Sequence, residues 1–510
     1  MKIRFLYLLL GLPLVSAALK YFSYLYQSIT FPFDWEPTDG DHLNFAMRMA
    51  DHQAIYFTSE SGHLLSVYNP LYHFLISVIT DGTPSFFAAR ALSSGIWILT
   101  ILIILSRIKI RRIDLHSLII LNLLTFPPIQ GMILDTVQIG PSSLLGLLYL
   151  VTGLTLNKID PKISYLAPLL LAAGIMAGLT YYSKQQGIIV TLAGILFLIL
   201  KLPSKKYLIL FATTVAATLF IGIVLIDSID GNTFVRSTLL DLNNQIPGYW
   251  KLGAWRFVEF TLINSGLLAL VLLGIKKGDI SGRNLTFWQM SFFIHIPFLL
   301  YILRNGGGGP NYFLTFWITI IMILNDSDLN LVFKEKWKIA TRRGFKLESK
   351  MRNMIYSIVL PLIIVTAAFG SIINFKTLND VNFPPQRYIS NSMKLQDFAR
   401  NHTSGKYCKI LTARNSGVFL SSKCNIDSEN VITFQYAWKS DEAINKDVIK
   451  NRIRLKQYDL IATGAGMYPP EIQKLIRANY ILGIEKEINL NYGYIANMRV
   501  FIPNQEVTSE

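Results

Sequence analysis

Apolar runs of about 15–20 residues alternate with short polar segments over residues 1–373. A helical run of that length matches the hydrocarbon core of a bilayer. We therefore expect about eleven transmembrane helices, near residues 5–19, 85–106, 115–133, 141–156, 163–182, 187–202, 207–226, 257–274, 286–303, 310–325 and 354–373. The apolar stretch at 70–80 is too short to span and is predicted as a juxtamembrane or re-entrant helix.

Residues 374–510 have a polar, mixed pattern that indicates a second, α/β domain. Helical stretches there are interleaved with β-like runs at 408–413, 431–438, 459–466 and 491–503. About 135 residues suffice for such a domain to have its own core. Its two cysteines, Cys408 and Cys424, are expected either to form a disulfide or to stay as buried thiols.

Composition and charge place the chain in a membrane. Hydrophobic residues make up 52% and charged residues only 16%, with a mean hydropathy of +0.39, which excludes a soluble protein of 510 residues. The net charge of +16 lies in basic runs at 107–112, 276–283 and 334–352, which mark cytoplasmic loops and not a nucleic-acid surface. We expect a multi-pass protein of the cell (inner) membrane, with a cytoplasmic amino terminus and an extracytoplasmic carboxy-terminal domain.

The first residues permit one alternative. Lys2, Arg4, a short apolar stretch and small residues at 16–18 are also typical of a signal peptide. In both cases the loop at 21–84 lies outside the cytoplasm.

This first outer loop is the most acidic part of the chain. It holds seven carboxylates against one basic residue, Arg48, and these are Asp34, Glu36, Asp39, Asp41, Asp51, Glu60 and Asp81. Carboxylates can deprotonate a hydroxyl or hold a divalent cation. The histidines at 42, 52 and 63 are not spaced to share one helical face, so we expect no histidine metal site.

Three more polar side chains are predicted at the same membrane surface. Asp135 lies in a short loop, while Lys184 and Arg304 each end a span, and the two cations can bind a phosphate. A carboxylate and two phosphate-binding cations beside the lipid indicate an enzyme that transfers a group from a lipid phosphate. Alternatively, Lys184 and Arg304 only reach toward the lipid headgroups, and Asp135 is a solvated loop residue or helix cap.

The motif order resembles a known enzyme family. TDGDHLNFAMRMADHQAIY, then YNPLYHFL, then TPSFFAARALSSGIWIL is similar to the amino-terminal part of the C-type (GT-C) membrane glycosyltransferases. That superfamily includes protein O-mannosyltransferases and the lipid A aminoarabinose transferase. Asp39 stands seven residues before Ala46, as the family's Asp does, and Arg90 fits the family's Arg-bearing span. AGIMAGLTYYSKQQGIIV and GGGGPNYFLTFW resemble the family's Lys-Gln and Asn-Tyr segments.

Two positions depart from the family pattern. Asp39-Gly40-Asp41 replaces the usual Asp-Glu pair, which leaves Asp39 or Asp41 as the base. GPSS at 140–143 replaces an Arg-x-Asp element, which leaves Asp135 as a substitute for the second acid.

The resemblance implies a polytopic α-helical transferase with a GT-C catalytic domain, residues 1–373, and an extracytoplasmic domain, residues 374–510. It would move a sugar from a polyprenyl-phosphate donor to a glycan, lipid or protein acceptor of the envelope, with inversion. Asp39 or Asp41 would accept the proton, and Asp135 would orient the acceptor or join a metal. Lys184 and Arg304 would hold the donor phosphate, and the implied substrate-binding residues are Tyr56, Gln185, Asn311 and Tyr312.

Other functions are less favoured by the sequence. No Gly-rich nucleotide loop is present, so no nucleotide cofactor is expected, and a divalent cation stays open. A transporter or lipid-carrier flippase is the alternative, but Arg90 and Glu259 are the clear ionisable residues within spans, and no inverted repeat is evident. A scaffold without catalysis is the third hypothesis.

Overall fold

A computed structural model gives the structure of this protein. It describes residues 3–35, 38–56, 68–107, 115–125, 132, 134–160, 162, 164–202, 204–230, 234–235, 238, 250–265, 267–268, 271, 285–303, 310–326, 346–381, 386–403, 408–412, 416–422, 424–428, 446–464, 468–491 and 494–504.

Helices dominate the first part of the chain. They are α1 (Ile3–Thr30), α2 (Asp39–Ala50), α3 (Leu71–Thr80), α4 (Phe86–Arg107), α5 (Leu115–Thr125), α6 (Ser142–Asn157), α7 (Leu166–Ser183), α8 (Ile188–Lys201), α9 (Lys205–Asp230), α11 (Trp250–Ile263), α13 (Phe287–Ile302), α14 (Leu314–Asp326) and α16 (Lys346–Asp380). Short 3-10 turns are η1 (Leu134–Thr136), η2 (Gln185–Gly187) and η5 (Pro310–Phe313). Each predicted span thus contains a helix.

The protein is a multi-pass membrane protein. Among the described residues, five helices are long and apolar enough to cross a bilayer: Leu8–Thr30, Phe86–Arg107, Leu166–Ser183, Lys205–Ile229 and Pro361–Asp380. Shorter apolar helices cover Leu71–Thr80, Ser142–Asn157, Gln185–Lys201, Phe287–Ile302 and Asn311–Asn325. The total of eleven spans stays a prediction.

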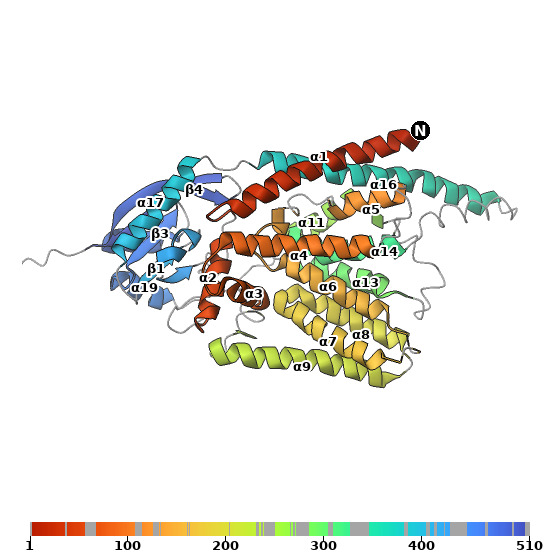
Figure 1. Ribbon diagram of the computed structural model, residues 1–510, viewed down its shortest axis with the longest axis horizontal. Helices are drawn as coiled ribbons and strands as arrows, with labels where there is room; N and C mark the ends of the chain where they lie inside the picture. The colour runs from red at the N-terminus through yellow and green to blue at the C-terminus, as the bar shows by residue number, and fades with distance from the viewer. Residues whose placement is uncertain are drawn as a thin grey trace, which may run out of the picture.

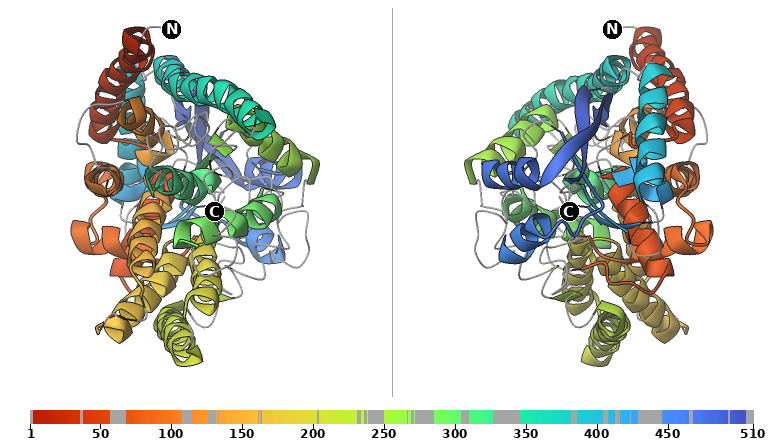
Figure 2. Two further views of the ribbon diagram at one scale, coloured as in Figure 1. Left: turned by 90° about the vertical axis from the view of Figure 1, so that its right-hand side faces the viewer. Right: turned by 90° about the vertical axis from the view of Figure 1, so that its left-hand side faces the viewer.

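The long helices lie side by side, and the carboxy-terminal domain covers one end of them (Figure 1). The amino terminus lies at the other end, where α1 begins its course along α16. Short helices α2 and α3 lie between the bundle and the domain. Figure 2 shows α9 at the margin of the bundle, where only 11% of its apolar window is buried, as a helix that faces lipid requires.

The carboxy-terminal domain is the predicted α/β unit. Its sheet has the order β2-β1-β3-β5-β4, with β1 parallel to β2 and β3, and β5 antiparallel to β3 and β4. The strands are β1 (Lys409–Thr412), β2 (Asn425–Ser428), β3 (Leu460–Gly464), β4 (Tyr480–Asn491) and β5 (Tyr494–Pro503), and the helices are α17 (Gln386–His402), α19 (Lys446–Arg454) and α20 (Pro470–Asn479). The strand expected at 431–438 lies outside the described residues.

A disulfide joins Cys408 and Cys424, whose Cα atoms are 4.9 Å apart. The bridge ties the residues that precede the parallel strands β1 and β2. Of the two states expected for these cysteines, the structure has the disulfide.

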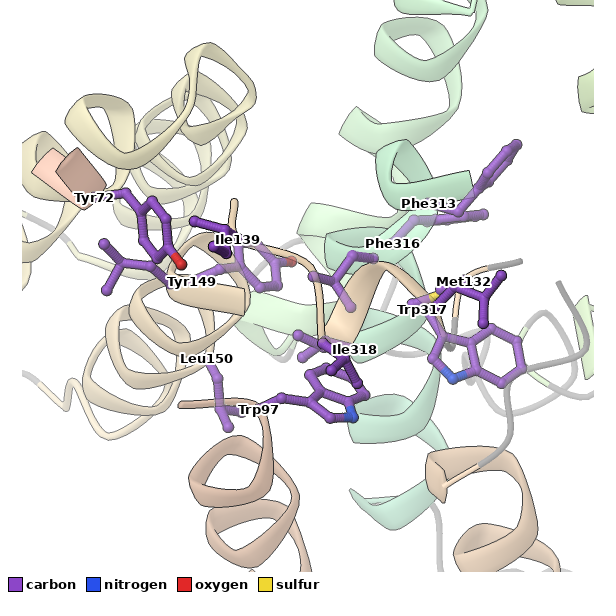
Figure 3. Close-up of a cluster of buried hydrophobic side chains, with 14 of the residues drawn as sticks. Tyr72, Trp97, Met132, Ile139, Tyr149, Leu150, Phe313, Phe316, Trp317 and Ile318 are labelled. Carbon is purple, nitrogen blue, oxygen red and sulfur yellow. The ribbon is translucent and has the colours of Figure 1, made fainter. Parts of the chain in front are cut away.

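The bundle core is built from large aromatic side chains on α4, α6 and α14 (Figure 3). Trp97, Tyr149 and Trp317 are at most 1% exposed, and the indole N–H of Trp317 donates to the carbonyl of Leu123 at 2.9 Å. Ile139 belongs to the same cluster. Because Ile139 lies between η1 and α6, this packing fixes the 134–142 loop on top of the bundle.

Candidate active site

Residues from distant parts of the chain form hydrogen bonds with the 134–142 loop. The backbone N–H of Ile139 donates to Asp39 Oδ1 at 2.9 Å. The Lys184 ammonium donates to the hydroxyl of Ser142 at 3.3 Å. Asp39 and Lys184, predicted as base and phosphate ligand, are therefore held by the same short loop.

Asp39 forms a buried ion pair with Arg90. Its Oδ2 lies 2.6 Å from Nη2 and 3.1 Å from Nε of the guanidinium, and both side chains are fully buried. Oδ2 also accepts the backbone N–H of Trp35 at 3.2 Å. The remaining guanidinium protons go to the carbonyls of Ser28, Phe31 and Phe33. Arg90 thus joins the end of α1, the start of α2 and α4.

Asp41 and Asp34 face the carboxy-terminal domain. The hydroxyl of Ser416 donates to Asp41 Oδ1 at 2.8 Å, and the backbone N–H of Gly40 donates to Asp34 Oδ1 at 2.7 Å. Burial, and then the neighbouring carboxylates, raise the pKa of Asp34 well above its usual value. A raised pKa favours the protonated form of Asp34, in which this side chain does not repel the neighbouring acids.

Glycine is required where the two domains meet. A Cβ on Gly40 would lie 2.2 Å from the backbone nitrogen of Gly417 in η6 (Ser416–Val418) and 2.4 Å from Asp34 Oδ1. Such contacts are too short for any side chain, so α2 and η6 approach each other through bare backbone.

Lys184 and Asp135 lie close to each other at the 134–142 loop. Lys184 ends α7, is 6% exposed, and its Nζ stands 4.9 Å from the centre of the Tyr312 ring. Burial lowers the pKa of Lys184 to about 8, although the charge of Asp135 acts against this shift. A buried ammonium with aromatic and hydroxyl neighbours is suited to bind an anion, since a bound anion would balance its charge.

Asp135 is held by two hydrogen bonds, from the side chain of Gln138 and from the backbone of Asn311. Burial raises its pKa to about 6, and these two bonds and Lys184 reduce the shift. Oδ2 of Asp135 and Oδ1 of Asn311 are buried, with no partner among the described residues. A carboxylate with a free oxygen and a pKa near neutrality is suited to accept a proton.

Two histidines lie beside the same loop. His42 on α2 and His73 on α3 are hydrogen-bonded through Nδ1 and Nε2 at 2.7 Å. His42 Nε2 faces Gly140, where an added Cβ would lie 3.7 Å away. No local pattern predicts this pair, because 31 positions separate the two histidines.

The other predicted site residues are distributed differently. Tyr56 donates to the carbonyl of Tyr68 at 2.8 Å and packs on Phe234, in a cluster separate from the main core. Gln185 begins η2 directly after Lys184. Arg304 lies outside the described residues. Its role stays a prediction, like those of the other proposed site residues.

No group of three or more His, Cys, Asp or Glu side chains placed to hold a metal ion occurs within the described ranges. Asp41 bonds to Ser416, and Asp39 is paired with Arg90.

A cleft of about 800 Å³ opens between α2 and the carboxy-terminal domain. Its lining includes Asn44, Arg48 and Asp51 on the α2 side and Lys409 and Ser421 on the domain side. Apolar side chains such as Met47, Leu420 and Ile426 line the cleft beside these charged groups.

Comparison with known proteins identifies the fold. ArnT from Cupriavidus metallidurans, solved with undecaprenyl phosphate, matches over 98% of this chain and 99% of its own, with a TM-score of 0.56 and 10% identity. This chain has the GT-C fold. The apo oligosaccharyltransferase of Archaeoglobus fulgidus shares the GT-C fold over 92% of this chain and 70% of its own, with a TM-score of 0.53 and 10% identity.

A third GT-C structure is AglB from the same archaeon, in complex with an inhibitory peptide and a dolichol-phosphate. It covers 91% of this chain and 70% of its own, with a TM-score of 0.50 and 11% identity. No protein-family model matches the chain, and no curated protein matches it by sequence.

Proposed function

We propose that this protein is a glycosyltransferase that moves a sugar from a polyprenyl-phosphate donor to a hydrophilic acceptor of the cell envelope. The observation that carries the proposal is the buried pair of Lys184, at the end of α7, and Asp135, in the 134–142 loop, a cation suited to phosphate beside a carboxylate suited to a proton. The GT-C fold, found in ArnT with undecaprenyl phosphate and in AglB with a dolichol-phosphate, supports a lipid-phosphate donor.

The reaction follows from these roles. Asp135 Oδ2 takes the proton of an acceptor hydroxyl, whose oxygen attacks the anomeric carbon of the sugar. The bond from that carbon to the phosphate oxygen breaks, and the configuration is inverted. Lys184, with the Ser142 hydroxyl, binds the released polyprenyl phosphate, and Arg304 is a further candidate for the same charge.

The buried acids take different roles in this scheme. Asp39 accepts hydrogen bonds on both oxygens, so it positions the start of α2 through Arg90 and the 134–142 loop. Asp41 is the competing base, and its bond to Ser416 would have to open first. Tyr56, Gln185, Asn311 and Tyr312 stay proposed substrate contacts, with Asn311 Oδ1 an unused acceptor for a sugar hydroxyl.

The orientation is also part of the proposal. The amino terminus and the carboxy-terminal domain lie at opposite ends of the helices (Figure 1). A cytoplasmic amino terminus puts the site and the disulfide on the outer side, where a lipid must carry the sugar because nucleotide sugars are absent.

A transfer assay in nanodiscs tests the function. The purified protein is incubated with a panel of polyprenyl-phosphate sugars and an envelope extract, and released polyprenyl phosphate is measured. We expect Lys184→Ala and Asp135→Asn to lower the turnover number by about 10²–10³-fold and 10²–10⁴-fold.

Lys206→Ala is the matched control, since its ammonium also lies on a ring, 5.0 Å from the centre of Tyr207, but is exposed. Wild-type protein that moves these lipids across the bilayer without cleaving the sugar would contradict the transferase and favour a flippase. Full turnover in Asp135→Asn would move the base role to Asp41.

A further inference from the structure

The His42–His73 pair is the least explained polar group near the proposed site. The two rings stack at 24° with their centres 5.0 Å apart, and both side chains are at most 2% exposed. Aromatic rings surround them: Tyr68 lies 4.6 Å from the ring of His42, and Phe45 lies 5.4 Å from that of His73. Two buried polar rings on short helices usually need a reason beyond packing.

Both imidazoles are neutral at physiological pH. Burial lowers the pKa of His73 to about 3. Burial, then His73 and Lys184, lower the pKa of His42 well below its usual value. A neutral imidazole has one nitrogen that donates and one that accepts, so the hydrogen bonds decide where each proton lies.

The ring nitrogen of His73 that has no hydrogen-bond partner determines the tautomers of both histidines. His73 Nδ1 is buried and has no partner among the described residues. A buried ring nitrogen without a partner costs less free energy when it is unprotonated than when it carries a proton. An N–H without an acceptor leaves the stronger hydrogen-bonding group unsatisfied. The proton of His73 is therefore on Nε2 and is donated to His42 Nδ1. The proton of His42 must then be on Nε2.

The Nε2–H group of His42 faces the proposed phosphate site. His42 Nε2 lies against Gly140, two residues before Ser142, which holds the Lys184 ammonium. Gly140 has no side chain to cover the imidazole, and Lys184 is near enough for its charge to act on His42.

From this geometry we propose that His42 donates its Nε2–H to a phosphate oxygen of the polyprenyl-phosphate donor, and that His73 is a positioning residue that holds His42 in the donating tautomer. The inference rests on the proposed function. A neutral donor suits this place, because an imidazole N–H adds a hydrogen bond to the phosphate without adding charge beside the Lys184 ammonium.

Binding measurements in nanodiscs test the pair. The probes are a polyprenyl phosphate and the polyprenol of the same chain length, which lacks only the phosphate. We expect His42→Ala to weaken binding of the phosphate about tenfold to hundredfold and to leave the polyprenol unchanged, because a hydrogen bond to a charged group is lost. His42→Gln, which keeps a side-chain N–H near the same place, should recover most of this loss.

His73 is tested by rescue. His73→Ala removes the hydrogen bond that holds His42 in the donating tautomer, so it should weaken phosphate binding about threefold to tenfold. His73→Gln can still donate to His42 Nδ1 and should restore phosphate binding. A structural role alone would affect both lipids equally. His402→Ala is the control, an exposed histidine at the end of α17.

A variant that leaves both histidines in place gives an independent reading. Gly140→Ala adds a methyl group 3.7 Å from His42 Nε2, an ordinary contact in the empty protein, but one that fills the space of the phosphate oxygen. It should weaken phosphate binding without lowering the melting temperature.

The outcomes separate the two proposals. Wild-type protein that binds both lipids equally contradicts the proposed function. Selective binding that is lost in Lys184→Ala but kept in His42→Ala contradicts only the histidine inference. Equal loss of both lipids in His42→Ala, with no rescue by glutamine, assigns the pair to packing and also overturns it.

Discussion

Replacing Asp39 by asparagine should destabilise the protein more than it slows the chemistry. All five guanidinium hydrogen bonds of Arg90 end on buried oxygens, and Asp39 is its only described carboxylate partner within ion-pair distance. Asparagine keeps the shape but removes the charge. Both carboxylate oxygens of Asp39 accept, one from Ile139 and one from Arg90, so the amide NH₂ meets a donor in either orientation.

The size of the effect follows from burial. Leaving one member of a buried ion pair without its partner costs about 3–5 kcal/mol. The three carbonyl bonds of Arg90 persist in the variant, so the loss comes from the uncompensated charge and the misplaced amide. A double variant, Asp39→Asn with Arg90→Gln, should recover part of the loss, because no buried charge then lacks a counter-charge.

The assay compares stability and activity in the same preparations. Denaturant unfolding in mixed micelles gives the free energy of unfolding, and sugar transfer is measured per folded molecule. Asp397→Asn is the control, an exposed acid on α17 that also faces an arginine, Arg400, at 3.8 Å. Folded Asp39→Asn should keep its turnover number within about tenfold of wild type, against a loss of about 10²–10⁴-fold for Asp135→Asn. A variant as stable as wild type but inactive would refute this reasoning and make Asp39 the base.

Three further outcomes follow from the geometry. The kcat/KM of wild-type protein should rise with pH as Asp135 loses its proton near pH 6 and fall as Lys184 loses its charge near pH 8; a rate that stays flat from pH 5 to about 9 would contradict both roles. Replacing Cys408 and Cys424 together by serine should destabilise the carboxy-terminal domain by about 3 kcal/mol, seen as faster proteolysis of that domain, since a loop of 16 residues is released. Gly40→Ala, whose methyl group would lie 2.2 Å from a backbone nitrogen of η6, should lower the melting temperature, and an unchanged value would show that α2 and η6 do not touch as described.

Helices were the most predictable part of the fold. A chain in lipid must satisfy its backbone hydrogen bonds within each segment. Each long apolar run therefore forms a helix, and the position of the run predicts the position of the helix. The span expected at 85–106 is Phe86–Arg107, and the one at 286–303 is Phe287–Ile302. By contrast, α1 extends to Thr30 although its expected end was residue 19, because Lys20, Ser23 and Gln27 are polar without being helix breakers.

Strand β4 had no clear signal in the sequence. It lies at the edge of the sheet and carries Glu485, Lys486 and Glu487 in succession. Charges protect an exposed edge from pairing with other chains, but they also hide the alternation by which a strand is recognised. The parallel strand β3 is fully buried and was expected.

Candidate site residues could be chosen from the sequence, but their hydrogen-bond and ion-pair partners could not. Asp39, Asp135 and Lys184 stand out by type and by predicted side of the membrane. The bond between Asp41 and Ser416 joins residues 375 positions apart, and no local pattern specifies such a contact. Likewise, Arg90 was expected within a span, but nothing local predicts that it takes its counter-charge from Asp39.

The position of Arg90 bears on how the protein is made. An arginine at the centre of a membrane helix costs about 2.5–3.5 kcal/mol, and Arg90, near the first turn of α4 (Phe86–Arg107), also needs acceptors because it is fully buried. All its acceptors lie at residues 28–39, upstream of α4. Since ribosomes synthesise the chain from its amino terminus, these oxygens already exist when α4 enters the bilayer. We therefore expect Arg90 to meet its counter-charge as α4 inserts, so that the order of synthesis is also the order in which this part of the protein can fold.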